Sequence, residues 1–105
     1  MELVILESPF AGERKRNIDY ARKCMLDCFN RNEAPFASHL LYTQCLDDDF
    51  EPHRFLGITA GLKWGEKATK SVVYTAYGIS KGMEYGIKDA EKNNRVIEYR
   101  TILWM

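Results

Sequence analysis

The chain has 105 residues, a length that suits one hydrophobic core, and we expect residues 1–105 to form a single domain. Fifteen basic and fifteen acidic side chains cancel to a formal net charge of zero, which argues against binding a nucleic-acid polymer through its phosphates. No signal peptide or membrane-spanning run is recognisable, so we expect no membrane partner. Three cysteines cannot all pair within one chain, which favours reduced thiols and a cytoplasmic protein.

The first half of the chain predicts two strands and two helices. Residues 3–6 (LVIL) form a short apolar run that reads as a buried strand, ended by Pro9. Apolar residues then recur at helical spacing from about 13 to 31, with Cys24 and Cys28 as small core residues rather than metal ligands. Residues 34–42 predict a second strand that runs into a loop. A second helix follows around Phe55, Ile58 and Leu62, where Gly57 and Gly61 permit close packing against a neighbour.

The second half predicts a strand over 71–77, a helix within 76–90 and a last strand over 95–103. This alternation indicates an α/β protein with a four- or five-stranded parallel sheet, joined by right-handed crossovers in the order 2-1-3-4. Ligands of such sheets bind at the carboxyl ends of the strands. We therefore expect the site at the loops SPFAGE, SHLLYTQ and YGISKGM.

These three loops supply the candidate ligand-binding residues. They are Ser8, Pro9, Phe10, Gly12, Arg14, His39, Tyr42, Gly78, Ser80, Gly82 and Met83.

Ser80 and Gly82 precede a helix, where free backbone N–H groups and a hydroxyl suit a phosphate or carboxylate. The alternative is that Ser80 only caps the helix, a frequent role of serine. His39 is either a ligand contact or a structural residue, and Phe10 or Tyr42 could stack on a base. We expect no metal ion and no cofactor.

Several motifs together resemble the nucleoside 2-deoxyribosyltransferase-like superfamily. They are SPFAGE, Asn17-x-x-Tyr20-Ala21-x-x-Cys24, ASHLLYTQ, LGITAGLKW and YGISKGMEYGIKDA. The nearest match is a small uncharacterised branch common in bacteria and phages, related to 2′-deoxynucleoside 5′-phosphate N-hydrolases. The resemblance implies a flavodoxin-like three-layer sandwich, a homo-oligomer, and a 5′-phosphate bound by Ser80.

The resemblance fails at one position. The superfamily pattern S-x-G-x-x-x-E places its catalytic glutamate where this chain has Gly86. Glu84, the nearest carboxylate and a candidate catalytic residue, lies about 200° around the helix from that position and cannot simply replace it. We expect Gly86→Glu to restore a carboxylate and to improve helix propensity by up to about 1 kcal/mol.

The leading functional hypothesis is therefore binding of a nucleotide or nucleotide-derived ligand. One alternative is an active N-glycosidase or deoxyribosyltransferase that uses another carboxylate, such as Glu13 or Glu84. A second alternative is a structural or protein-interaction domain with a vestigial pocket. We also expect a homodimer or larger homo-oligomer, because no final helix covers the last strands on the side of the first helix, and residues 103–105 include Trp104 and Met105, types enriched at interfaces.

Overall fold

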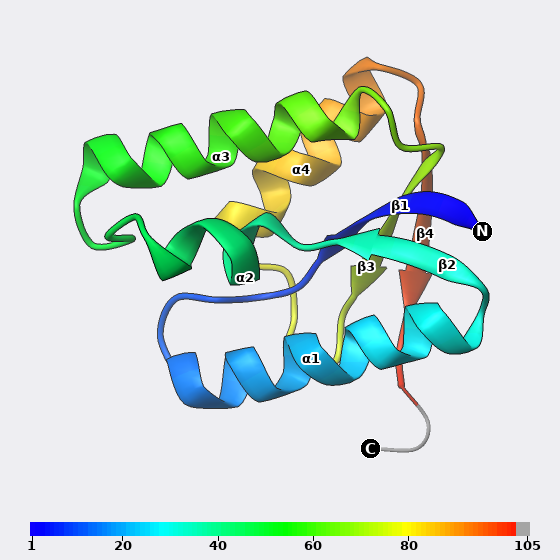
Figure 1. Ribbon diagram of the computed structural model, residues 1–105, viewed down its shortest axis with the longest axis horizontal. Coiled ribbons are helices and arrows are strands. Elements are labelled where there is room, and N and C mark those ends of the chain that lie inside the picture. The colour runs from blue at the N-terminus through cyan, green and yellow to red at the C-terminus, as the bar shows by residue number, and fades with distance from the viewer. Residues whose placement is uncertain (103–105) are drawn as a thin grey trace.

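The computed structural model describes residues 1–102 and consists of a four-stranded sheet between two layers of helices (Figure 1). The order of elements along the chain is β1 (Glu2–Glu7), α1 (Arg14–Asn30), β2 (Glu33–Phe36), α2 (Ser38–Leu41), a 3-10 turn (Tyr42–Gln44), α3 (Glu51–Gly65), β3 (Lys70–Tyr74), α4 (Lys81–Lys92) and β4 (Val96–Arg100). Within the described part of the chain, no helix combines the length and the apolar character needed to cross a membrane.

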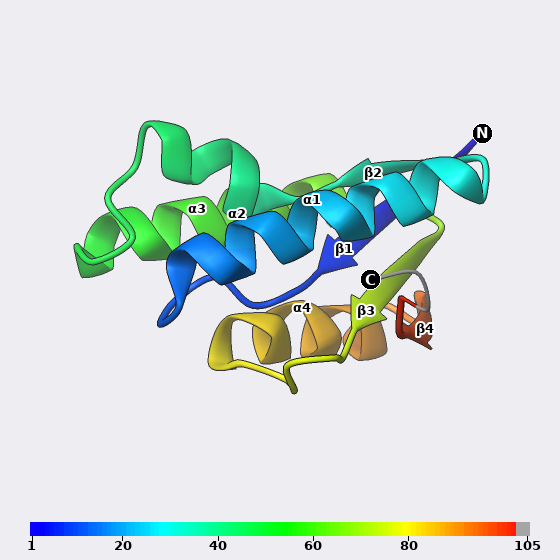
Figure 2. The same cartoon turned by 90° about the horizontal axis from the view of Figure 1, so that it is seen from below.

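The sheet is parallel throughout, with strand order β2-β1-β3-β4. In register, Leu6 of β1 lies opposite Val72 of β3, and Val73 lies opposite Tyr99 of β4. Helix α1 covers one face, and α3 and α4 lie on the other (Figures 1 and 2). The predicted α/β class, strand order and three-layer arrangement are confirmed.

Each face of the sheet has its own hydrophobic cluster. On the α1 side, Val4, Leu6 and Val72 pack with Cys24 and Cys28, which are free, fully buried thiols as expected. Across the sheet, a smaller cluster joins Val73 of β3 to Met83 and Ile87 of α4. Alternate residues of one strand face opposite layers, so β3 is buried from both sides and anchors the sheet.

The segment after β2 differs from the prediction. Residues 38–44, expected as a loop, form α2 and a 3-10 turn. Gly61 of α3 explains how α2 is held, because a Cβ at position 61 would lie 2.8 Å from the side chain of Ser38. Close packing at this glycine, which the sequence predicted, brings α3 against the segment that carries His39.

On the α1 side, β3 and β4 carry charged side chains beside the apolar residues of the cluster. Arg100 bonds Glu33 through two nitrogen–oxygen contacts of 2.7 Å, and Lys70 lies 2.9 Å from the same carboxylate. These bonds lower the pKa of Glu33 to about 2. Ile102 also folds back into the α1-side cluster. The homo-oligomer was expected because β3 and β4 would expose an apolar face beside α1, and these contacts do not support that reason. Leu103, Trp104 and Met105, the other part of the expectation, lie outside the described residues.

Candidate ligand-binding site

A cavity of about 320 Å³ opens at the carboxyl edge of the sheet, where the three predicted loops meet. The walls come from the end of β1, the α2 segment, the first turns of α3 and the start of α4. Seven of the predicted residues line it: Ser8, Phe10, His39, Tyr42, Ser80, Gly82 and Met83. Helix α3 was not expected to contribute, and it supplies His53, Arg54, Gly57 and Ile58.

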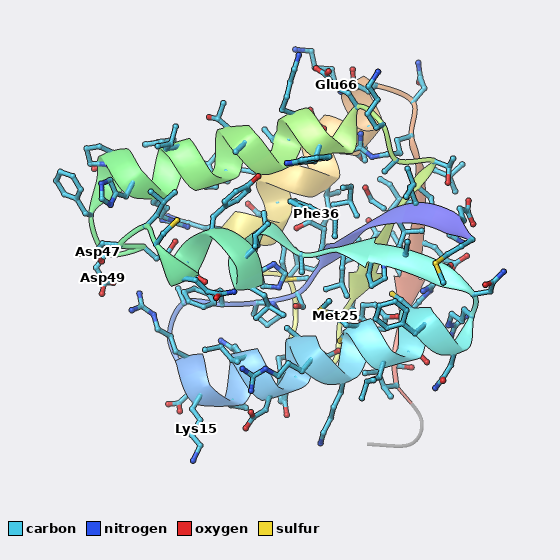
Figure 3. All side chains as sticks on the ribbon, in the orientation of Figure 1. Lys15, Met25, Phe36, Asp47, Asp49 and Glu66 are labelled. Carbon is cyan, nitrogen blue, oxygen red and sulfur yellow. The ribbon has the colours of Figure 1, made fainter. Side chains whose placement is uncertain are left out.

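The other predicted residues lie elsewhere. Pro9 is buried without lining the cavity, and Gly12 and Gly78 have φ values of +91° and +81°, which identify them as turn residues. Arg14 pairs with Asp49 at 2.6 Å. Asp49, labelled in Figure 3, lies on the turn before α3. Glu84 is exposed on α4 and does not line the cavity.

The loop after β1 is held in place by the start of α1. Asn17, only 1% exposed, donates from Nδ2 to the carbonyls of Phe10 and Ala11 at 3.0 Å each. Tyr20, one turn further along α1, accepts a 3.2 Å hydrogen bond from the backbone N–H of Ala76, after β3. The Asn17 and Tyr20 positions of the quoted motif therefore fix the two loops that flank the cavity.

His39 and Ser8 meet within the cavity wall. The Ser8 hydroxyl and His39 Nε2 are 2.7 Å apart. Burial lowers the pKa of His39 to about 4, so the imidazole is uncharged at neutral pH. No positive charge is therefore fixed at this point, and the pair offers neutral hydrogen-bonding groups.

The ring of Tyr42, which lines the cavity, is held by two other aromatic side chains. Phe36, labelled in Figure 3, has its ring centroid 6.1 Å from that of Tyr42 and 5.4 Å from that of Trp64. The Tyr42 hydroxyl also accepts a 2.8 Å hydrogen bond from Trp64 Nε1. Tyr42 is thus held by packing and by a hydrogen bond, so its ring is a preformed surface of the cavity.

The start of α4 forms the polar end of the cavity. The Ser80 hydroxyl accepts a hydrogen bond from Met83 N–H at 3.3 Å, so Ser80 does cap the helix. Backbone N–H groups in the first turn of a helix have no carbonyl partner within it, which leaves those of Lys81 and Gly82 for a ligand. The Ser80 hydroxyl proton is not used by the cap, so capping and ligand binding are compatible.

Glu7, the last residue of β1, also lines the cavity and was not predicted as a site residue. Burial raises its pKa to about 8; Arg95 opposes this rise and Asp89 adds to it. In the sequence, Glu7 appears only as an acidic residue that directly follows the apolar run LVIL. An acidic residue directly at the end of a buried parallel strand was the available signal, because that edge is where such sheets bind ligands.

A family model matches residues 2–100, nearly the whole chain. The chain belongs to the DUF7768 family. DUF7768 is a domain of unknown function, so membership brings no activity, ligand or partner. Comparisons with curated proteins and with solved structures found no match. The deoxyribosyltransferase-like resemblance of this DUF7768 chain accordingly stays a prediction.

No metal centre accompanies the cavity in the described part of the chain. Among residues 1–102, no three side chains of His, Cys, Asp or Glu gather closely enough to hold a metal ion. Asp49, within the acidic run before α3, is engaged by Arg14 instead.

Proposed function

We propose that the protein binds a nucleotide or nucleotide-derived ligand, with a phosphate at the N-terminus of α4. The observation that carries this proposal is the opening of that helix end into the cavity. The free N–H groups of Lys81 and Gly82, the Ser80 hydroxyl and the helix dipole all favour an anion at this point. The lining residues Lys81 and Arg54 add positive charge, and the acidic lining residues are Glu7 and Asp48.

The rest of the cavity suits a flat, partly apolar group. Phe10 and Tyr42 present aromatic rings, and Leu46 and Ile58 add apolar surface. A volume of about 320 Å³ lies within the roughly 300–1,000 Å³ range of small-molecule sites. A base stacked on an aromatic ring, with its phosphate at α4, would use both ends of the cavity.

Thermal unfolding in the presence of small ligands tests this function. The panel contains nucleoside monophosphates, the matching nucleosides, cyclic nucleotides, NAD and inorganic phosphate. A ligand at 100 times its Kd stabilises the folded state by about 2.7 kcal/mol, which is a readily measured rise in Tm. We expect nucleotides to raise Tm more than nucleosides. If no nucleotide exceeds both its nucleoside and inorganic phosphate, the proposal fails and a vestigial pocket becomes the better description.

Cleavage of an N-glycosidic bond is a second candidate function, and one observation favours it. The carboxylates considered from the sequence lie outside the cavity, because Glu13 and Glu84 are both exposed and neither lines it. Glu7 does line it, beside the Gly86 position of the superfamily pattern. A carboxyl group is thus present where the sequence alone indicated that one had been lost.

A further inference from the structure

The Glu7 carboxyl group is influenced by the charges of Arg95 and Asp89 but is not bonded to either of them. It makes no hydrogen bond or ion pair among residues 1–102. No fully enclosed side-chain nitrogen or oxygen of these residues lacks a hydrogen bond, so the Glu7 oxygens are not sealed in the interior. Glu7 is one of the residues that line the cavity, and the end of its side chain lies against Gly86 of α4.

Gly86 of α4 makes room for this carboxyl group. A Cβ at position 86 would overlap the end of the Glu7 side chain, since its three nearest atoms are Oε2, Cδ and Oε1 of Glu7, and the farthest of these lies at 2.9 Å. Glycine inside a helix costs about 1 kcal/mol relative to alanine. Gly86 is buried in α4 despite this lower helix propensity, and the absence of a side chain there lets Glu7 lie against the helix backbone.

The surrounding charges do not neutralise Glu7. Arg95, before β4, donates to Asp89 of α4 at 2.9 Å, to the carbonyl of Gly65 at 2.9 Å and to Ser71 Oγ of β3 at 2.9 Å. Its charge is therefore already shared with Asp89, which itself repels a negative Glu7.

The remaining elements around the cavity offer little compensation. His39 of α2 is uncharged. The other ionisable groups lining the cavity are Asp48, His53, Arg54 and Lys81, and none of them bonds Glu7. Glu7 consequently remains protonated at neutral pH and holds a transferable proton in the cavity.

We propose that Glu7 is the proton donor for cleavage of the N-glycosidic bond of a nucleotide bound in this cavity. The inference rests on the second candidate function above. The bond between the sugar carbon and the base nitrogen breaks, its electron pair stays with the base, and the Glu7 proton is transferred to the base. The oxygen of a water molecule then bonds to the sugar carbon, and the proton that this water loses returns to the Glu7 carboxylate. The net reaction converts a nucleotide and water into a free base and a sugar phosphate.

The test incubates the protein with deoxynucleoside and ribonucleoside 5′-monophosphates and measures free base by liquid chromatography. Glu7→Gln keeps the shape of the side chain but cannot supply the proton. General acid catalysis contributes about 10²–10⁴-fold to a rate, so we expect Glu7→Gln to release base at least 100-fold more slowly. Glu91→Gln removes an exposed carboxylate of α4 that does not line the cavity, and it should leave the rate unchanged. Nucleotide affinity, measured by calorimetry, should change less than threefold in both variants.

A second variant displaces the Glu7 carboxyl group but leaves Glu7 in the chain. Gly86→Ala places a methyl group where the Glu7 carboxyl lies, so it should displace that carboxyl and reduce base release at least tenfold. The wild-type rate should fall as pH rises through about 8, because Glu7 then loses its proton. A rate that instead rises with pH through 8 overturns the assignment of Glu7 as proton donor.

The remaining outcomes separate the two proposals. Nucleotide binding without base release overturns the role of Glu7 and leaves the binding function standing. Base release that survives Glu7→Gln also overturns it. Absence of both binding and release overturns the binding function as well.

Discussion

The carboxyl group of Glu7 occupies the space that a side chain at position 86 would need. The two residues come from different layers, Glu7 from the end of β1 and Gly86 from the second turn of α4. Their fit corrects the expectation that Gly86→Glu would simply improve helix propensity, because any side chain at 86 must first displace Glu7. It also explains why a buried helix position carries glycine.

We expect the coupling between these residues to appear in a double-mutant cycle. In a Glu7→Ala background, Gly86→Ala should stabilise the protein by up to about 1 kcal/mol, the usual propensity gain. With Glu7 present, the same substitution should gain less or destabilise, because the carboxyl group must leave its place. Urea unfolding of the four proteins measures the difference. Equal effects of Gly86→Ala in both backgrounds would contradict the overlap.

Glu7 should also make stability depend on pH. In the unfolded chain this carboxyl has its ordinary pKa near 4.5, whereas in the folded protein the pKa is about 8. Between these values the folded state holds a proton that the unfolded state has lost, so the free energy of unfolding falls as pH rises from 4.5 to 8. Glu7→Gln removes this effect and should stabilise the protein above pH 8 by up to about 5 kcal/mol, since each pKa unit corresponds to about 1.4 kcal/mol.

Thermal unfolding from pH 4.5 to 9 measures this prediction. The advantage of Glu7→Gln over wild type should be smallest near pH 4.5, grow to about pH 8 and then level off. Glu91→Gln, with its exposed side chain, should show no such trend. Parallel curves for wild type and Glu7→Gln would mean that Glu7 titrates normally.

The two roles of Ser80 can be separated by two substitutions. Ser80→Ala removes both the helix cap and the phosphate contact, so it should cost about 1 kcal/mol of stability and about 1.5–3 kcal/mol of nucleotide affinity. Ser80→Asp keeps a capping oxygen, and its negative charge repels a phosphate. We expect Ser80→Asp to fold with wild-type stability but to bind nucleotides at least tenfold more weakly.

Calorimetry with a nucleotide and its nucleoside measures the Ser80 contact. The nucleoside should bind all three proteins about equally, because it lacks the phosphate. Wild-type nucleotide affinity in Ser80→Asp would place the phosphate elsewhere. An equal loss for nucleoside and nucleotide in Ser80→Ala would point to a disturbed helix start instead.

The expected homo-oligomer stays a prediction, and the most apolar exposed helix is its best location. Phe55, Leu56 and Trp64 of α3 are each about half exposed, and Gly65 is the only residue of α3 that is buried. Such side chains on one helix are typical of interfaces. Light scattering at micromolar concentration should give at least twice the 12.2 kDa of one chain.

Leu56→Asp tests this location, with Arg22→Asp on the exposed side of α1 as the matched control. We expect Leu56→Asp to lower the mass toward that of a single chain and Arg22→Asp to leave it unchanged. A wild-type mass near 12.2 kDa would exclude the oligomer, and an unchanged mass for Leu56→Asp would exclude α3 as its interface.

The sequence by itself determined the order of the four strands and the three long helices, but not α2, and it indicated the edge of the sheet where the site lies. Apolar runs, helical spacing and the Ser80 cap are local signals, and right-handed crossovers convert their order into a sheet topology. Residues that lie within those loops, such as Ser8, His39 and Ser80, could therefore be placed at one edge before the structure was known.

Only the tertiary structure decided which side chains meet. Three contacts join segments that are distant in sequence. Glu7 fills the space beside Gly86, Arg14 pairs with Asp49 instead of lining the cavity, and Arg100 pairs with Glu33. Sequence periodicity assigns a residue to a face of its own element, but it does not give the distance to a residue on another element. That distance is set by how the layers pack. Here the packing makes Glu7 a lining residue of the cavity, although the sequence pattern had indicated that the carboxyl group at position 86 was lost.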